Sequence, residues 1–432
     1  MKYSEYKDSQ TTWMGVVPSH WKIERAKWHF ALRNERGNDT PILLAATQKY
    51  GMYPQDMVEG VVKVSEGTDV QQFRTVHKGD FVISLRSFQG GFERSDYEGV
   101  CSPAYQVFYA DNNWNNDYLK YLFKNELFVD AMNALTVGIR EGRNIKYEDF
   151  ANSVLAIPPI TEQIAIAEFL DAKVAHIDSV IAEAKASIEE YKAWKASIIY
   201  EAVTKGLDPN VEMKDSGVEW IGDIPADWDV IRLKNVISFI ESGVSVNAAQ
   251  TPANEGGIGV LKTSSVSKYS FRPEENKEVN VEELGRVSCP VKANTIIVSR
   301  MNTPELVGAC GFVEQNWPNL FLPDRLWQVH FVKSVNVKYV WYYLCSNYIR
   351  SYYASLSSGT SSSMQNISQG QFENAYLMLP PYEVQLELVE HLDKKCSSID
   401  SLIFEKESLI SDLESYKKSL IFEVVTGKRK VV

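Results

Sequence analysis

The sequence predicts an α+β protein with a pseudo-twofold internal repeat, in which two mixed α/β domains are separated by two long antiparallel coiled-coil helices. Two observations lead to this prediction. Blocks of sequence recur in both halves of the chain, and apolar residues recur at alternating spacings of four and three through two stretches free of Gly and Pro. At 432 residues the chain is also too long for one ordinary core, so more than one domain is expected.

The first repeated block lies at the beginning of each half. Lys-Asp-Ser at positions 7–9 recurs at 214–216, and nine of the 21 residues from 7 to 27 are identical to residues 207 positions further on. Two tryptophans are among them: Trp13 and Trp21 match Trp220 and Trp228. Agreement of this extent is very unlikely by chance, so the two halves are predicted to be copies of one unit.

The second repeated block has an offset of 222 positions. Pro-Pro at 158–159 recurs at 380–381, and Ile-Asp-Ser at 177–179 recurs at 399–401. The second half therefore carries 15 additional residues within its globular block, since 222 exceeds 207 by 15. Each half is predicted to be a globular block followed by a helical block, with these boundaries: 1–157, 158–206, 207–379 and 380–432.

The globular blocks contain signals of both strand and helix. Short β-rich segments at 80–84 and 295–299 are bounded by Gly, Asn and Pro, which are common in turns. Aromatic segments at 118–128 and 339–348 are typical of helices. A mixed α+β fold is therefore expected for each block.

The helical blocks are predicted to pair along a narrow apolar seam. Each helix would have about 40 residues and a length of roughly 60 Å. The alternative is a helix that lies on the core of its own domain, but the narrow seam and the charged opposite faces favour a coiled coil. The seam includes Leu170, Ile177, Ile181 and Ile188 in the first helix and Leu392, Ile399, Ile403 and Ile410 in the second, with Lys195 and Lys417 at matching seam positions.

Connectivity predicts that the two helices are antiparallel. Only residues 207–210 separate the first helix from the second globular block, so that block must lie at the far end of the helix. The second helix begins beside the second block and can pair with the first helix only by running back along it. The two halves would then be related by a pseudo-twofold axis.

Composition restricts the function classes. The chain is 44% hydrophobic and 23% charged, as in folded soluble proteins, and it has neither a signal-peptide core nor an apolar stretch of membrane-spanning length. Five scattered cysteines and six dispersed histidines predict a cytoplasmic protein without a metal site. The net charge of −11 argues against a nucleic-acid binder, although a near-neutral domain can still present a basic face.

Four motifs stand out: W-I-G-D-I-P-A-D-W at 220–228, P-P-I-T-E-Q at 158–163, I-D-S-V-I at 177–181 and A-V-T-K-G-L-D-P-N at 202–210. These motifs resemble those of the specificity subunits of type I restriction-modification systems, and the resemblance extends over essentially the whole chain. The second Pro-Pro block departs from the family pattern because it keeps only Gln385, and the second half has Val-Thr-Gly-Lys where the first has Val-Thr-Lys-Gly.

The resemblance implies a non-catalytic subunit with two target-recognition domains, each of which reads one half of an asymmetric, interrupted site in double-stranded DNA. The helices would set the separation of the half-sites and bind two methyltransferase subunits, and motor-nuclease restriction subunits would complete the complex. S-adenosylmethionine, ATP and Mg would belong to those partners, and this chain would carry no cofactor. In agreement, the sequence contains no G-x-x-x-x-G-K-[ST] phosphate loop and no N-P-P-[FY] methyltransferase motif.

Two segments in each half carry side chains suited to DNA contact, because base edges and phosphates are read by Arg, Lys, Asn, Gln, Ser and Thr. For Arg86, Arg143 and Arg300, phosphate contact is the expected role. Asn144 and Asn366 have an alternative role as caps of a turn before the last strand, since both halves keep them although they should read different sequences. The candidates are Arg86, Ser87, Gln89, Arg94, Arg140, Arg143, Asn144 and Lys146 in the first half, and Arg300, Asn302, Thr303, Thr360, Ser362, Gln365 and Asn366 in the second.

Two other function classes are open to test. The first is a coiled-coil adaptor or scaffold that never touches DNA, which a gel shift on genomic fragments would distinguish. The second is a fused restriction-methylation enzyme, which the missing motifs argue against. The four repeated tryptophans are expected to be core residues and not platforms on which bases stack.

Overall fold

The computed structural model describes residues 2–37, 42–59, 70–85, 87–135, 145–218, 221–361 and 364–431. The chain forms two compact units, each of which is described by itself. Unit 1 comprises Met1–Lys185 and Glu407–Val432, and unit 2 comprises Ala186–Lys406. Both units mix helices and strands, as the sequence predicts.

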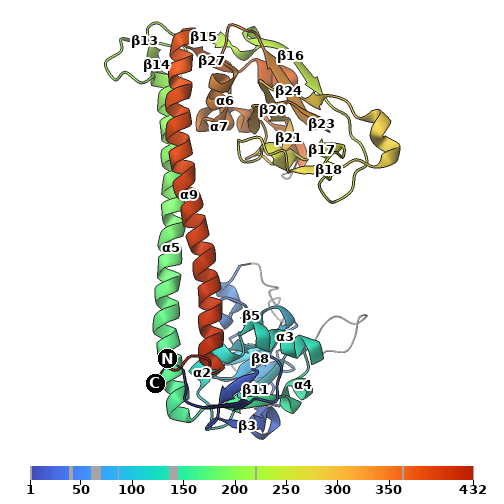
Figure 1. Ribbon diagram of the computed structural model, residues 1–432, viewed down its shortest axis with the longest axis vertical. Coiled ribbons are helices and arrows are strands. Elements are labelled where there is room, and N and C mark those ends of the chain that lie inside the picture. The colour runs from blue at the N-terminus through green and yellow to red at the C-terminus, as the bar shows by residue number, and fades with distance from the viewer. Residues whose placement is uncertain are drawn as a thin grey trace. The chain divides into compact units, whose positions relative to one another are not determined.

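Two long helices pass through both units (Figure 1): α5 (Ile160–Lys205) and α9 (Tyr382–Val425). Each begins directly after a Pro-Pro pair, where proline is tolerated because the first N–H groups of a helix have no partner within it. Gly206 and Gly427 follow the helix ends with φ of +75° and +70°, the left-handed conformation that ends many helices. A side chain on Gly427 would press on Pro18 and Trp21, whereas one on Gly206 would make ordinary contact with Trp228. In each unit, a glycine after the end of a long helix thus lies beside a repeated tryptophan.

Unit 1 is built around the four-stranded sheet β4-β11-β8-β9, whose strands pair antiparallel. Phe123, directly after α2, and Phe128 and Phe150, from α3 and α4, belong to one core beside the sheet. The strands are β1 (Tyr6–Asp8), β2 (Val16–Pro18), β3 (Lys22–Arg25), β4 (Phe30–Leu32), β5 (Leu44–Thr47), β6 (Gly51–Pro54), β7 (Arg74–Val76), β8 (Phe81–Ile83), β9 (Glu93–Arg94), β10 (Gly99–Cys101), β11 (Gln106–Ala110) and β12 (Val154–Ile157). The short helices are α1 (Ser87–Gly90), α2 (Asn116–Leu122), α3 (Glu126–Leu135) and α4 (Tyr147–Asn152).

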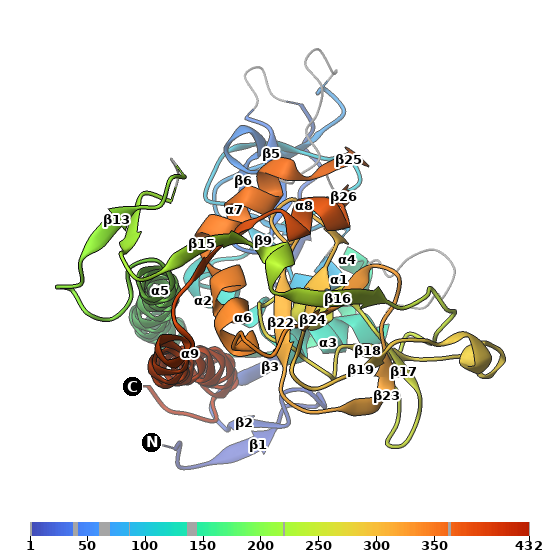
Figure 2. The ribbon, with the colours of Figure 1, turned by 90° about the horizontal axis from the view of Figure 1, so that it is seen from above.

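Unit 2 is built around the sheet β16-β24-β20-β22, which has the same kind of order. Helix α6 packs on β22 and β20, α7 lies next to α6, and α8 lies next to α7 (Figure 2). The strands are β13 (Met213–Asp215), β14 (Asp223–Pro225), β15 (Asp229–Arg232), β16 (Ile237–Ser242), β17 (Gly259–Leu261), β18 (Asn276–Glu278), β19 (Pro290–Val291), β20 (Thr295–Ser299), β21 (Met301–Asn302), β22 (Cys310–Val313), β23 (Trp317–Phe321), β24 (Leu326–Phe331), β25 (Ser358–Ser361), β26 (Met364–Asn366) and β27 (Tyr376–Leu379). The short helices are α6 (Val337–Cys345), α7 (Asn347–Leu356) and α8 (Gln369–Glu373).

The helical segments expected from aromatic residues are broken in both units. Residues 118–128 belong to α2 and α3, and residues 339–348 belong to α6 and α7. The break in unit 2 lies at Ser346, which is the N-cap of α7. Because the sequence pattern continues across the break, periodicity alone does not reveal it.

A buried glutamine near the start of each long helix makes the same hydrogen bonds in its own unit. Gln163 accepts from the Asn115 N–H at 2.8 Å and donates to the Pro158 carbonyl at 2.9 Å. Gln385 accepts from the Asn336 N–H at 2.8 Å and donates to the Pro380 carbonyl at 2.8 Å. Each glutamine thereby fixes the beginning of its long helix to the loop before α2 or α6. This role explains why Gln survives in the second Pro-Pro block when its neighbours change.

The apolar seam of the long helices is buried to different extents. Leu170, Ile177 and Ile181 pack in the core of unit 1, together with Leu420 and Val424 of α9. In unit 2, Ile188, Leu392 and Ile399 are buried, whereas Ile403 is half-buried. Ile410, in unit 1, is also half-buried.

The two seam lysines form ion pairs with the aspartates of the repeated Ile-Asp-Ser motif. In unit 1, Lys417 Nζ lies 2.7 Å from Asp178 Oδ1, and in unit 2, Lys195 Nζ lies 2.6 Å from Asp400 Oδ2. The lysine comes from one long helix and the aspartate from the other in both pairs. The motif therefore has a structural reason to recur.

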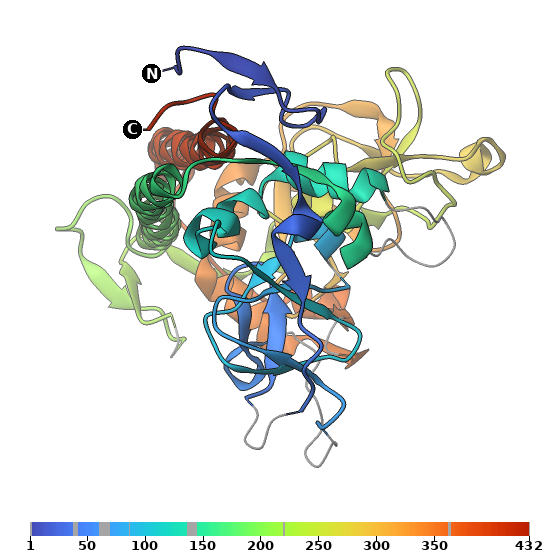
Figure 3. The same cartoon turned by 90° about the horizontal axis from the view of Figure 1, so that it is seen from below.

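The two ends of the chain meet in unit 1, as Figure 3 shows. Lys428 Nζ donates to the carbonyl oxygens of Met14, at 2.5 Å, and of Val16. Partial burial lowers the pKa of Lys428 from its ordinary value. The segment after α9 is thus bound to the segment that precedes β3.

Candidate nucleic-acid interface

In unit 2, the two segments predicted to contact DNA are brought together in one small sheet. Strand β21 pairs antiparallel with β26, so that Met301 lies opposite Asn366 and Asn302 opposite Gln365. Strand β25 extends this sheet on the other side of β26. Strand β21, from the first segment, and residues 364–366, from the second, thus lie side by side although they are far apart in the chain.

Two buried polar atoms in this sheet have no hydrogen-bond partner in the part of the chain that the structure describes: Arg300 Nε and Asn366 Oδ1. The Arg300 guanidinium carbon lies 5.8 Å from the centre of the Trp327 ring. Unpartnered buried polar groups are uncommon in proteins and call for an explanation. Arg300 directly precedes β21, and Asn366 lies on the neighbouring strand β26. An open donor and an open acceptor at these places are suited to a ligand that both donates and accepts, as base edges do.

Other candidates in unit 2 have local partners or lie outside the description. The Asn302 side-chain oxygen accepts from the Thr303 N–H at 2.9 Å. Ser362 lies outside the described residues, and the Thr360 side chain is not described. Ser368, and not Asn366, caps the following helix α8, with a capping box formed with Gln371. The capping alternative is therefore wrong for Asn366.

In unit 1, four candidates lie outside the residues that the structure describes: Arg86, Arg140, Arg143 and Asn144. Ser87 is buried, and its hydroxyl accepts from the Ser84 N–H at 2.8 Å. Gln89 is exposed at the end of α1. Ser87 thus serves the turn after β8, and Gln89 is accessible to a ligand.

Arg94 is engaged within the protein. Its guanidinium pairs with Asp117 and, at 2.7 Å, with Asp96. These contacts hold the pKa of the Asp117 carboxyl below its ordinary value despite burial. A phosphate could bind Arg94 only in competition with two carboxylates, so a structural role is the better assignment for this residue.

A buried ion pair lies next to Arg94. Glu93 is almost completely buried and lies 2.6 Å from Lys124 Nζ. Burial raises the pKa of Glu93 to about 7, because desolvation of the carboxylate outweighs its attraction to the ammonium group. Unit 1 therefore contains a carboxyl group that titrates near neutral pH.

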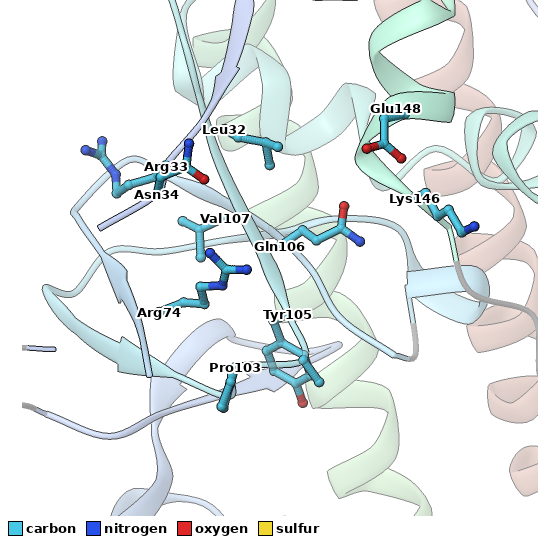
Figure 4. A pocket seen from close by; sticks show the side chains of 11 residues that line it. Leu32, Arg33, Asn34, Arg74, Pro103, Tyr105, Gln106, Val107, Lys146 and Glu148 are labelled. Carbon is cyan, nitrogen blue, oxygen red and sulfur yellow. The ribbon is translucent and has the colours of Figure 1, made fainter. Parts of the chain in front are cut away.

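Lys146 is exposed and lies at an open cavity of about 400 Å³ (Figure 4). Sequence reasoning missed most of this site, since its residues come from four separate segments without a common motif. Polar residues that become neighbours of an arginine only in the fold follow no periodic pattern along the sequence, so they could not be found from it. The cavity is lined by Leu32, Arg33, Asn34, Arg74, Pro103, Ala104, Tyr105, Gln106, Val107, Lys146 and Glu148.

The repeated tryptophans contribute to the cores, as expected. Trp21 and Trp228 are buried in units 1 and 2, and Trp13 packs edge-on against Phe128. Trp220 lies outside the described residues. Among the residues with described positions, no cluster of His, Cys, Asp or Glu is suited to hold a metal, and no helix is long and apolar enough to cross a membrane.

The family model of the type I restriction modification DNA specificity domain matches the chain twice, over residues 22–190 and 225–407. The two matches cover most of the chain, one in each half. The chain belongs to this family, whose role is DNA specificity.

Curated relatives and a solved structure agree with this assignment. The chain is 27% identical over 212 residues to the EcoEI specificity subunit of Escherichia coli, a match that covers 48% of this chain but only about a third (35%) of that subunit. It is 22% identical over 338 residues to the EcoKI specificity subunit of Escherichia coli K12, covering 76% of this chain and 68% of the relative. A solved chain of a type I R-M system shares the fold with a TM-score of 0.66 at 15% identity, covering 95% of this chain and 98% of that chain.

Proposed function

We propose that this chain is the subunit that reads DNA sequence in a type I restriction-modification complex in the cytoplasm. It binds an asymmetric bipartite site in double-stranded DNA, with one half-site for each of its two recognition domains. The observation that carries the proposal is the specificity domain present twice in one chain. The alternative of an adaptor that does not touch DNA gives no reason for two such domains.

In this proposal, residues 1–157 and 207–379 are the recognition domains, and residues 158–206 and 380–432 are helical spacers. The recognition surfaces differ although their sheets have the same kind of order. Unit 1 presents Lys146 beside an arginine-lined cavity, and unit 2 presents the sheet that holds Arg300, Asn302 and Asn366. Different side chains on similar sheets are what two readers of different half-sites require.

The spacers are proposed to pair as an antiparallel coiled coil with pseudo-twofold symmetry. The two lysine–aspartate pairs support this arrangement. Position 178 of α5 contacts 417 of α9, whereas position 195 of α5 contacts 400 of α9. Contact positions thus rise along one helix as they fall along the other, as antiparallel pairing requires.

The outer faces of the spacers are proposed to bind two methyltransferase subunits, through which the restriction subunits join the complex. Exposed large apolar side chains on both helices support a docking role, since such groups on a surface often mark interfaces. Trp194 and Tyr200 are exposed on α5, and Phe404 and Tyr416 on α9. Light scattering with excess methyltransferase should give a mass for two partners per chain, and a stable 1:1 limit would contradict this.

The experiment that tests the proposed function is methylome sequencing of cells that carry the whole operon. The modified motif should have two parts separated by unspecified bases. Arg300→Ala should weaken recognition of one part, and Arg86→Ala or Arg143→Ala recognition of the other. If Arg86→Ala relaxed both parts equally, the model of two independent readers would be wrong.

A further inference from the structure

The cavity of unit 1 is lined by cationic and hydrogen-bond donor groups, and some of these have no partner among the described residues. It lies beside the edge strand β4, between the beginning of β7, the residues that enter β11, and the beginning of α4. Three basic side chains line it: Arg33, Arg74 and Lys146. Among the described residues that line it, Glu148 is the one with a carboxylate.

Arg33 is already engaged within the protein. Its Nε and a terminal nitrogen lie 2.6 and 2.9 Å from the two carboxylate oxygens of the buried Asp80, and its other terminal nitrogen lies 2.8 Å from Glu35. In Figure 4 its guanidinium points away from Gln106 and Lys146. Arg33 therefore shapes the cavity wall, and its charge is neutralised by its own carboxylates.

Arg74 and Lys146, in contrast to Arg33, are not paired with carboxylates of the described residues. Arg74 Nε is buried without a hydrogen-bond partner, and no ion pair of Arg74 or Lys146 is found among the residues with described positions. Gln106 lies beside them, and its side-chain oxygen accepts from the Tyr147 N–H at 2.7 Å. That contact fixes the amide so that its NH₂ group is available to donate. The Arg74 guanidinium and the oriented Gln106 amide face one open space, and the exposed Lys146 lies at its edge with its ammonium group turned away in this view (Figure 4).

We propose that this cavity binds a phosphodiester group of the DNA backbone beside the half-site that unit 1 reads. Arg74 and Lys146 supply the charge, and the Gln106 amide donates to a phosphate oxygen. Most protein–DNA contacts are made to phosphates, and charge-assisted contacts to them are strong. The inference rests on the proposed function and adds the residues that position unit 1 on DNA.

Unit 2 has no such group of cations at the corresponding places. Gln106 pairs with β8 as Trp327 pairs with β20, and Lys146 is the N-cap of α4 as Ser368 is of α8. Glu148 corresponds to Gly370 at the repeat offset of 222. At these three places, the described part of unit 2 therefore does not repeat the side chains that line the cavity of unit 1.

The test uses the full chain in complex with methyltransferase, a duplex with the modified motif and a duplex without it. Arg74→Gln and Lys146→Gln should each weaken binding to both duplexes at least about tenfold, since contacts to charged groups contribute about 1.5–3 kcal/mol. Each should also flatten the plot of log affinity against log salt by about one unit of slope. Lys78→Gln removes the same charge from an exposed position outside the cavity and should change neither quantity.

Glu148→Gln gives a change of the opposite sign. Removal of the carboxylate beside an anion site should strengthen binding to both duplexes several-fold, an effect that loss of folding cannot produce. Lys146→Gln also guards against misfolding, because Lys146 is exposed whereas Arg74 Nε is buried.

Three outcomes would overturn the inference. The first is that Arg74→Gln and Lys146→Gln both leave the affinity and the salt slope unchanged while the wild type binds its motif. This outcome would not affect the proposed function. Another is a changed methylation motif at unchanged salt slope, which would show base reading. A third is displacement of the wild type from DNA by millimolar inorganic phosphate beyond an equal ionic strength of chloride, which would show a site for a free anion. If the wild type bound neither duplex, the proposed function would fail as well.

Discussion

At the scale of single residues, the sequence predicted the residues of the cores better than the residues that could contact a ligand. Trp21 and Trp228 were expected in the cores and are buried there. Gln163 and Gln385 were visible as a repeat, but their role emerged only from their contacts with a distant loop. The cavity around Arg74 could not be predicted, because its residues become neighbours only after the sheet has formed. Residues that repeat in both halves indicate structure that the halves share. The surfaces proposed to read DNA differ between the halves, so the repeat does not reveal them.

The buried glutamines should be important for stability. Gln385→Leu would leave the Asn336 N–H and the Pro380 carbonyl without partners, and each unsatisfied buried group costs about 1–3 kcal/mol. We expect the free energy of unfolding of unit 2 to fall by about 2–4 kcal/mol in urea titrations. Gln369→Leu, at an exposed position, should change it by less than about 0.5 kcal/mol. Equal effects of the two variants would contradict the structural role.

Glu93 should make unit 1 less stable as the pH rises through weakly acidic values. Its pKa is about 7 in the folded unit and 4.5 ordinarily, so the folded state binds the extra proton between these values. The contribution of Glu93 to the free energy of unfolding is therefore complete below pH 4.5 and is lost as the pH rises to about 7, a change of up to about 3 kcal/mol. Glu93→Gln should remove this part of the pH dependence of unfolding, and Glu98→Gln, at an exposed position, should leave it in place.

At the scale of elements, the long helices were the part most accessible from sequence. A Pro-Pro pair comes directly before each long helix, a Gly follows its end, and neither Gly nor Pro lies within it, so these residues mark the observed ends of α5 and α9. The breaks between α2 and α3 and between α6 and α7 were missed, because caps such as Ser346 are local features within a continuous apolar pattern. Helix length follows from the sequence, whereas a break depends on what the flanking turns pack against.

The lysine–aspartate pairs should be energetically coupled. Asp178→Lys would place like charges together and should lower the stability of unit 1 by up to about 1 kcal/mol, the upper range for an exposed pair. Adding Lys417→Asp should restore most of the loss. A double-mutant cycle in urea would measure the coupling, and a doubly reversed protein no more stable than the single variant would argue against the pair.

At the scale of the whole molecule, the repeat predicts that one half can pair with itself. Asp178 of one copy occupies the place of Asp400, so a fragment of residues 1–212 should homodimerise through two Lys195–Asp178 pairs between copies. Sedimentation should show a dimer at tens of micromolar, roughly the range in which weak interfaces associate. Lys195→Asp should shift it toward monomer, and adding Asp178→Lys should bring the dimer back. A folded fragment that stays monomeric would count against the pseudo-twofold arrangement.

The two buried glutamines have a consequence for how such a protein changes over generations. They anchor each long helix through contacts that involve no side chain of the cavity or of the small sheet around Arg300. Mutations on those polar surfaces can therefore accumulate without disturbing the anchors. A lineage could acquire a new target sequence while its scaffold stays under unchanged selection, and variation among descendants should concentrate on the surfaces and spare the glutamines.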